Sequence, residues 1–298
     1  MNLYTPVTLP PHVITLDTDS KVMMLGSCFA EHVGERLRMY MGCDSVDVNP
    51  FGVLYNPTSI AQAIKLLISH EDLPSITGNK HIFHGQDGVW HSWLHSSHFS
   101  DKTKEGCIEK TTARLTVARE MLKDATLLCI TFGTTRHYRH GGLVVANCHK
   151  EPQRCFTEEE PSLEELKILW ANVLQELKAF NPKLKTVFTV SPYRYRKYGF
   201  HISQIQKAKL LLLCDYLCNS RETTENEETY TAYFPSYEIQ LDELRDYRFY
   251  KEDMLHPSDQ AVNIIAERFM DWSFSPGLKE ESVKRLKEYR LKQHRKLI

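Results

Sequence analysis

Short runs of apolar and β-branched residues, each stopped by a turn residue, are the clearest feature of the hydrophobic pattern. The runs are residues 21–25, 126–132 and 186–190. They end at Gly26, at Gly133 and at the Ser191-Pro192 pair. Continuous runs without alternation are typical of strands that are covered on both faces of a parallel sheet. We therefore expect three buried parallel strands.

Segments of helical periodicity separate these runs. They are residues 29–41, 60–69, 111–123, 162–180 and 203–219. Ser162 and Glu165 have the spacing of a capping box, and Asn181-Pro182 supplies the stop. Alternating strands and helices predict an α/β fold, an open three-layer α/β/α sandwich with a mainly parallel sheet. In such sheets ligands bind beyond the carboxyl ends of the strands.

Two segments interrupt the alternation. Residues from about 79 to 101 hold a Gly85-Gln86-Asp87-Gly88 turn between apolar stretches, which predicts a β-hairpin insertion. Residues 277–298 mix charges with regularly spaced apolar residues, which predicts an amphipathic helix packed on, or extending from, a main domain of residues 1–276. Residues 221–229 are polar and indicate a solvated loop.

Composition and charge narrow the function classes. The 37 basic and 38 acidic residues give a formal charge of −1, which argues against a dedicated nucleic-acid binder. The start of the chain lacks a signal-peptide pattern, and the longest apolar run, residues 210–214, is too short to span a membrane. The eight cysteines show no paired spacing, which favours free thiols. We expect a cytoplasmic protein with neither a membrane nor a nucleic-acid partner, and the oligomeric state stays open.

Gly26-Ser27-Cys28 lies between a buried run and a helical segment. A side chain at this turn stands near a helix N-terminus, where free N–H groups and the helix dipole stabilise a thiolate or an oxyanion. Cys28 is therefore placed as a nucleophile. Taken alone, the segment favours a structural role, in which Gly26 permits the turn and Cys28 packs as a small hydrophobe.

Asp253 precedes His256 by three residues, just ahead of a predicted helix. This spacing lets a carboxylate hold one imidazole nitrogen and direct the other at a nucleophile. A capped turn with a solvated histidine is the structural alternative. The presence of both motifs in one α/β chain favours catalysis.

With these motifs the sequence resembles the GSCFA family, uncharacterised relatives of the SGNH (GDSL-type) hydrolases. The shared segments are residues 26–30, 49–57, 145–150, 189–192 and 246–256. The resemblance covers most of the chain and implies a flavodoxin-like sheet. It implies a hydrolase or acyltransferase for a small acyl ester, such as an acetyl group on a carbohydrate, that needs no cofactor.

The SGNH motifs imply roles for individual residues. Alignment of the first motif on Gly26 puts Cys28 at the nucleophile, with Asp253 and His256 as orienter and base. A shift of one residue would make Ser27 the nucleophile instead. The resemblance assigns the backbone N–H of Gly52 to the oxyanion hole.

The third SGNH motif, Gly-x-Asn, matches Gly133-Thr134-Thr135, so its asparagine is missing. Asn147 would replace that amide if its loop folds back over the strand edge. The missing asparagine also supports another class of function, a catalytically silent α/β ligand-binding module.

Several other polar residues are candidates for substrate binding. We include Thr135, His149, and Arg194 and His201 from the basic segment after Ser191-Pro192, which is equally consistent with a solvated loop. The hairpin histidines at 81, 84, 91, 95 and 98 fit no zinc-binding pattern, so we expect no metal. Trp90, Trp93 and His91 are instead expected to line one wall of the pocket.

Overall fold

The computed structural model describes residues 5–11, 14–69, 81–219 and 231–296. The loop predicted at residues 221–229 and the first residues of the predicted hairpin insertion lie outside these ranges.

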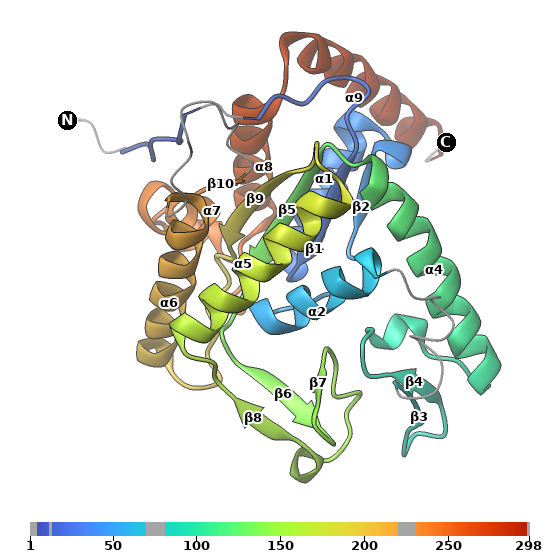
Figure 1. Cartoon of the computed structure of the whole chain (residues 1–298). Helices are drawn as coiled ribbons and strands as arrows, with labels where there is room; N and C mark the ends of the chain where they lie inside the picture. Colours follow the sequence, from blue (N-terminus) through green and yellow to red (C-terminus); the bar gives the residue numbers. More distant parts are fainter. Residues whose placement is uncertain (1–4, 12–13, 70–80, 220–230, 297–298) are drawn as a thin grey trace.

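The central sheet has five parallel strands (Figure 1). They are β1 (Val22–Gly26), β2 (Val46–Val48), β5 (Leu127–Phe132), β9 (Lys185–Val190) and β10 (Thr231–Tyr233). Their spatial order is β10-β9-β5-β1-β2, which is the flavodoxin-like 2-1-3-4-5 order when only these strands are counted. The three predicted strands are confirmed, and β2 and β10 extend the sheet on either side.

Helices cover both faces of the sheet and complete the predicted three layers (Figure 1). One face carries α2 (Pro57–Ile68), α4 (Lys104–Asp124), α5 (Leu163–Phe180) and α6 (Phe200–Asn219). The other carries α1 (Cys28–Met41) and α8 (Asp259–Ser273), and α9 (Pro276–Lys296) lies against α1. Met23 and Leu25 of β1 enter one core and Val22 and Met24 the other, because successive strand residues point to opposite faces.

The helix predictions are confirmed, although boundaries differ. α4 begins at Lys104 rather than at residue 111, because the side chain of Thr103 accepts the N–H of Gly106 and caps the helix. The capping box of α5 is present: the Ser162 hydroxyl accepts the Glu165 N–H at 3.2 Å, and the Glu165 carboxylate accepts the Ser162 N–H at 2.7 Å.

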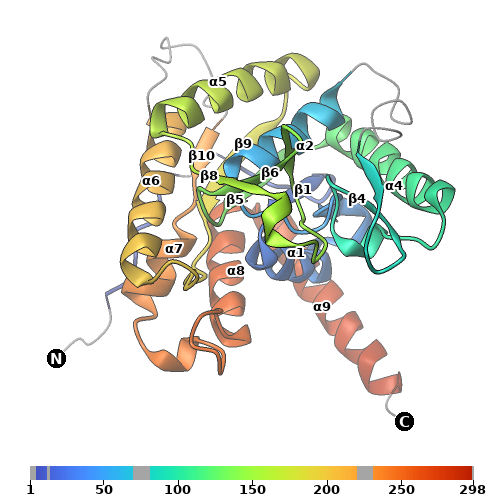
Figure 2. The same ribbon diagram turned by 90° about the horizontal axis from the view of Figure 1, so that it is seen from below.

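Two β excursions leave the central sheet. The predicted hairpin is formed by the antiparallel pair β3 (Ile82–His84) and β4 (Trp90–Ser92). A second antiparallel sheet, in the order β7-β6-β8, was not predicted. Its strands are β6 (His137–His140), β7 (Leu143–Val145) and β8 (Thr157–Glu159). Figures 1 and 2 place it below the central sheet, beside the carboxyl ends of the strands.

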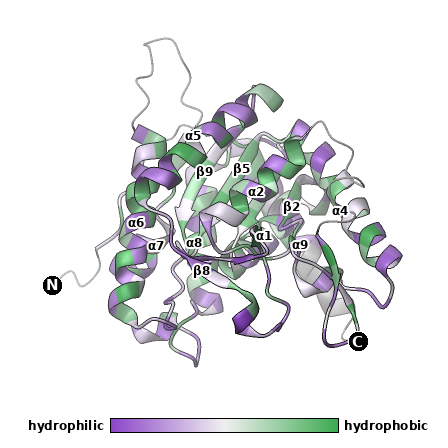
Figure 3. Cartoon of the chain, turned by 60° about the horizontal axis from the view of Figure 1, so that its bottom comes forward, coloured by the Kyte–Doolittle hydropathy of each residue, from purple (hydrophilic) through white to green (hydrophobic). Residues whose placement is uncertain are grey.

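Several short helical turns lie between the longer elements. They are the 3₁₀ turns Cys43–Ser45, Ser97–Phe99, Gln153–Cys155 and Tyr247–Phe249, the turn α7 (Ser236–Glu238) and the π turn Ile239–Glu243. Figure 3 shows that the central strands are largely hydrophobic and that the covering helices carry both hydrophobic and hydrophilic residues. Within the described ranges, no helix combines the length and apolarity that crossing a bilayer requires.

Candidate active site

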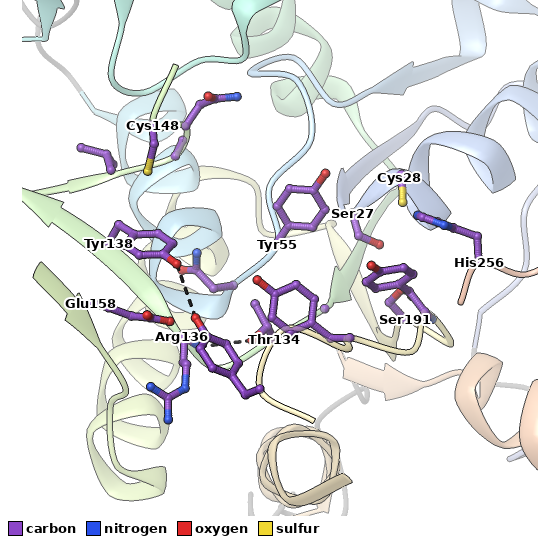
Figure 4. A pocket seen from close by; sticks show the side chains of 18 residues that line it. Ser27, Cys28, Tyr55, Thr134, Arg136, Tyr138, Cys148, Glu158, Ser191 and His256 are labelled. Atoms are coloured by element: carbon purple, nitrogen blue, oxygen red, sulfur yellow. Dashed lines mark hydrogen bonds between the residues drawn. The ribbon is translucent and has the colours of Figure 1, made fainter. Parts of the chain in front are cut away.

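A cavity of about 400 Å³ opens at the carboxyl edge of the central sheet (Figure 4). Its walls come from the turn after β1, the loop before α2, the ends of β5 and β9, the β7-β6-β8 sheet and the loop that carries His256. In the 2-1-3-4-5 order, β1 and β5 flank the point where the winding of the sheet reverses. Crevices at that point are where open α/β sheets bind ligands.

Gly26 allows the chain to leave β1 in close contact with β5. Its φ is 149°, and a Cβ there would lie 2.4 Å from the carbonyl oxygen of Thr131. Its N–H donates to Oδ1 of Asn49 at 2.9 Å, and its carbonyl accepts the N–H of Leu54 at 2.8 Å. The loop after β2 is thereby tied to the end of β1, which fixes the start of α1 at the cavity.

Ser27 and Cys28 both line the cavity, but their environments differ. Ser27 is only 2% exposed, and its hydroxyl finds no hydrogen-bond partner among the described residues. Cys28 is half-buried and begins α1. Burial raises the pKa of the Cys28 thiol, while the backbone N–H groups of Phe29 and of Cys28 itself lower it. The thiol therefore needs a base to become a nucleophile at neutral pH.

Asp253 and His256 form a tight polar turn. The imidazole Nδ1–H donates to Oδ2 of Asp253 at 2.5 Å. Oδ1 of Asp253 accepts the N–H of Leu255 at 2.8 Å and that of His256 at 3.0 Å. The His256 N–H, its imidazole and the Leu255 N–H, in that order, hold the pKa of Asp253 well below its usual range. With Nδ1 directed at Asp253, Nε2 of His256 has no hydrogen-bond partner among the described residues and can act as a proton acceptor.

The imidazole of His256 faces the turn Gly26-Ser27-Cys28, called the nucleophile turn below. Figure 4 shows the sulfur of Cys28 and the ring of His256 pointing toward one another across the cavity mouth. No hydrogen bond joins these two described side chains, as is common before substrate binds. The ring of Tyr193 packs on that of His256, with centroids 4.3 Å apart. The four residues predicted for catalysis, Ser27, Cys28, Asp253 and His256, are therefore brought together.

A family profile matches almost the whole of the α/β/α sandwich. The profile of the GSCFA family matches residues 21–269, from the start of β1 into α8. The chain belongs to the GSCFA family. A search of curated proteins gave no significant match. The region shared with other GSCFA proteins contains all four of these residues.

In this GSCFA chain, Gly52, predicted for the oxyanion hole, and Thr135, predicted for substrate binding, are both directed elsewhere. The N–H of Gly52 donates to the carbonyl of Asn49 at 2.7 Å, and Gly52 does not line the cavity. Thr135 is fully buried and donates to Glu160 at 3.0 Å. Both predictions were wrong, because the Gly52 N–H closes a turn within its own loop and the Thr135 hydroxyl is engaged by Glu160, between β8 and α5.

Three predicted substrate-binding residues are also outside the cavity lining. His149 is buried with Nε2 at 2.8 Å from the carbonyl of Ser92. His201 is exposed on α6. Arg194 instead stabilises the loop that carries His256. Its backbone N–H donates to the carbonyl of Leu255, and its guanidinium donates to the carbonyl of Met254, each at 3.0 Å.

The hairpin does not form a wall of the cavity, contrary to prediction. The ring of Trp93 stacks on Phe83 at 3.5 Å, and His91 is buried beside Asp87, with Nε2 at 3.0 Å from Oδ1. Trp90 tilts against His84 of the partner strand. In the described part of the chain, no three His, Cys, Asp or Glu side chains are arranged to hold a metal ion.

Asparagine side chains reach the cavity from two loops. Asn147 lines it as predicted, and its Oδ1 accepts the N–H of His149 at 2.8 Å. Asn56, which was not predicted, also lines it. Its Oδ1 accepts the N–H of Ser59 at 2.8 Å as the cap of α2, so its amide nitrogen remains available. In the sequence, Asn56-Pro57 carries the signal of a helix start and lies within the shared segment 49–57, which was the one indication of a role at the site.

The far end of the cavity comes from the unpredicted sheet. Arg136, Tyr138 and Glu158 lie there, away from Cys28 (Figure 4). Arg136 pairs with Glu160 at 2.8 Å, yet its Nε has no hydrogen-bond partner among the described residues, and neither has Oε1 of Glu158. A buried donor and a buried acceptor are therefore both unsatisfied at this end.

Lys207 is a buried lysine behind the same cavity wall, and sequence reasoning missed it as one charged residue in a helix. It is 2% exposed and donates to the carbonyls of Gly133 and Ser191, each at 2.7 Å. Burial lowers its pKa to about 7.

Proposed function

We propose that this GSCFA protein hydrolyses or transfers a small acyl group through a Cys-His-Asp site of the SGNH type. One observation carries the proposal: Cys28, at the N-terminus of α1, faces an imidazole whose other nitrogen is held by Asp253. This is the arrangement of nucleophile, base and orienter that acyl transfer requires.

The chemistry follows from these positions. Nε2 of His256 takes the thiol proton as the Cys28 sulfur attacks the acyl carbon of the ester. The tetrahedral intermediate collapses to a thioester, and His256 gives its proton to the departing alcohol. Water then attacks the thioester with His256 again as base, which releases the acid and restores the thiol. A second alcohol in place of that water would make the reaction a transfer.

In this mechanism, two groups would stabilise the oxyanion. The N-terminus of α1 supplies the backbone N–H of Cys28 and the positive end of the helix dipole. The amide nitrogen of Asn56 supplies a side-chain donor, because its oxygen is already anchored to Ser59. Asn56 would thus replace the asparagine that the third motif lacks.

The far end of the cavity supports a carbohydrate as the alcohol part of the ester. A sugar hydroxyl both accepts and donates, so one could satisfy Nε of Arg136 and Oε1 of Glu158. Tyr138, Tyr195 and Tyr198 line the same region, and aromatic side chains of this kind can contact the apolar side of a sugar. The charges there are balanced by neighbouring ion pairs, which favours a neutral group over a charged one.

The test is turnover of short-chain acyl esters, including acetylated monosaccharides, by the wild type and by Cys28→Ala, Ser27→Ala and His256→Ala. We expect Cys28→Ala and His256→Ala to lose turnover and Ser27→Ala to retain it. Loss with Ser27→Ala but not with Cys28→Ala would move the nucleophile to Ser27. A wild type without turnover on the whole panel would contradict the proposal.

A second candidate function is a ligand-binding module without catalysis. The observation that favours it is that the N–H groups of Gly52, Gly133 and Thr134 are all engaged with backbone carbonyls, so none is free for an oxyanion. Acetylated sugars would then raise the melting temperature of the wild type without being consumed.

A further inference from the structure

Met254 has an unusual backbone conformation in the turn of residues 251–256. Its φ is 59°, in the left-handed region that residues other than glycine seldom adopt. Met254 lies between Asp253 and His256, so this conformation shapes the turn in which the carboxylate reaches the imidazole. Its own side chain is exposed. A strained conformation persists only where surrounding contacts hold it, and such positions cluster at functional sites.

Arg194 supplies contacts that hold this turn. Its guanidinium donates to the carbonyl of Met254 and its backbone N–H donates to the carbonyl of Leu255, each at 3.0 Å. The guanidinium carbon also lies 4.4 Å from the ring centroid of Phe200 and 5.5 Å from that of Tyr250. Phe200 begins α6 and Tyr250 directly precedes the turn, so one side chain connects three segments. The two rings help to fix the guanidinium where it meets the turn.

The turn also closes on itself. The Met254 N–H donates to the carbonyl of Lys251 at 2.9 Å, and the Lys251 N–H donates to the carbonyl of His256 at 2.8 Å. These bonds stay within the turn and do not place it relative to the nucleophile. Arg194 and its neighbour Tyr193, whose ring packs on His256 with centroids 4.3 Å apart, join the turn to the segment after β9.

We propose that Arg194 is a positioning residue of this site. It holds Met254 in the left-handed conformation, which keeps the pair of Asp253 and His256 formed and directs Nε2 of His256 at Cys28. Arg194 does not line the cavity, so it acts on the reaction through the turn rather than on the substrate. The inference rests on the proposed role of His256 as base, but its first test needs no turnover.

The first measurement is the pair of ring ¹⁵N chemical shifts of His256 at pH 9, which report the ring nitrogen that carries the hydrogen. The signals are assigned by their absence in His256→Gln. The variants are Arg194→Met, which cannot donate, and Arg194→Lys, which keeps the charge and a donor. Arg248→Met is the matched control, because that exposed guanidinium pairs with Asp246 at 3.1 Å in a neighbouring turn.

In the wild type we expect the hydrogen on Nδ1, as the bond to Asp253 requires. In Arg194→Met it should move largely to Nε2, the nitrogen that carries it in free histidine, because the turn no longer holds the pair. Arg194→Lys should lie between the two, and Arg248→Met should match the wild type. Wild-type shifts in folded Arg194→Met would overturn the inference, because an arginine that only adds stability would leave the tautomer unchanged.

Met254→Gly tests the backbone strain itself and covers the case in which Arg194→Met does not fold. Glycine adopts the left-handed region without a steric cost, so this substitution relieves the strain that Arg194 counters. The double variant Arg194→Met/Met254→Gly should fold and carry the hydrogen largely on Nδ1 again. A double variant that keeps the hydrogen on Nε2, or that does not fold, would contradict the role of Arg194 in holding the left-handed turn.

Turnover of short-chain acyl esters separates positioning from substrate binding. Because Arg194 lies outside the cavity lining, Arg194→Met should lower kcat by about tenfold or more and leave KM nearly unchanged. A higher KM with an unchanged kcat would contradict a positioning role. The ring tautomer is measured without substrate, so the proposed function and the role of Arg194 can fail separately.

Discussion

The carboxylate of Asp253 accepts hydrogen bonds from both the backbone N–H and the imidazole of His256. In Asp253→Asn, the amide could place an NH₂ group against Nδ1, which would then have to accept, and the hydrogen would move to Nε2. That tautomer cannot take a proton from Cys28. We expect kcat/KM for a reactive acyl ester to fall by about 100-fold or more, mostly in kcat.

Asp246→Asn is the matched control for that prediction. Asp246 also accepts a backbone N–H two residues ahead, from Arg248 at 2.9 Å, but its turn holds no histidine. The steady-state rate of this variant should stay close to that of the wild type. Equal losses in both variants would mean that disruption of a turn, rather than the tautomer of His256, limits the rate.

The geometry around a residue was predictable from sequence where its partners are close along the chain. Asp253 and His256 are three residues apart, and Ser27 and Cys28 begin a helix directly after a strand. Gly52 was misassigned because its N–H partner depends on the shape of one loop. Lys207 could not be found, because its partners follow two other strands and only the folded chain brings them together.

At the scale of elements, the close approach of β1 and β5 at Gly26 controls the shape of the nucleophile turn. In Gly26→Ala, the new methyl group would meet the Thr131 carbonyl at 2.4 Å in a backbone conformation that disfavours side chains. The strands must separate or the turn must change. We expect the free energy of unfolding in urea to fall by at least about 2 kcal/mol, and ester turnover to fall with it.

Gly88→Ala separates the effect of backbone conformation from that of contact. Gly88 has a φ of 78° in the hairpin turn, and nothing lies within 4 Å of the position that the new methyl group would take. The free energy of unfolding of Gly88→Ala should be lower than that of the wild type by about 1 kcal/mol, without loss of turnover. If both variants lost the same stability, the contact between β1 and β5 would not be what requires glycine at residue 26.

Elements were predictable where a local signal was strong. The capping box of α5 and the buried runs of β1, β5 and β9 are of this kind. The strands β6 and β8 are short and mostly polar, and the apolar β7 has only three residues, so their pairing gives no clear hydrophobic pattern in the sequence. They form the far wall of the cavity, and the substrate side of the site was therefore less predictable than its catalytic side.

At the scale of the whole molecule, the 2-1-3-4-5 strand order brings together the candidate catalytic residues from opposite ends of the chain. Cys28 follows β1, and His256 precedes α8, which covers the same face of the sheet as α1. The order itself is what the resemblance implied, and it accounts for the site lying between β1 and β5. Residues at both edges of the GSCFA match thus meet in one cavity.

The buried ammonium of Lys207 should appear in the pH dependence of global stability. Its pKa is about 7 in the folded chain and about 10.4 when unfolded, so between these values the unfolded state binds more protons. This contribution makes the wild type more stable as pH rises from 7 toward 10, with a slope of at most about 1.4 kcal/mol per pH unit.

Urea unfolding of the wild type and of Lys207→Met at pH 7, 8 and 9, under reducing conditions, measures that slope. The difference in unfolding free energy, wild type minus variant, should grow with pH, because methionine binds no proton in either state. The difference in unfolding free energy between the wild type and Lys123→Met should not change with pH, since the Lys123 side chain is exposed. A flat difference for Lys207→Met as well would mean that Lys207 keeps its charge in the fold up to high pH. Its two carbonyl contacts would then compensate the burial of the ammonium more fully than its surroundings suggest.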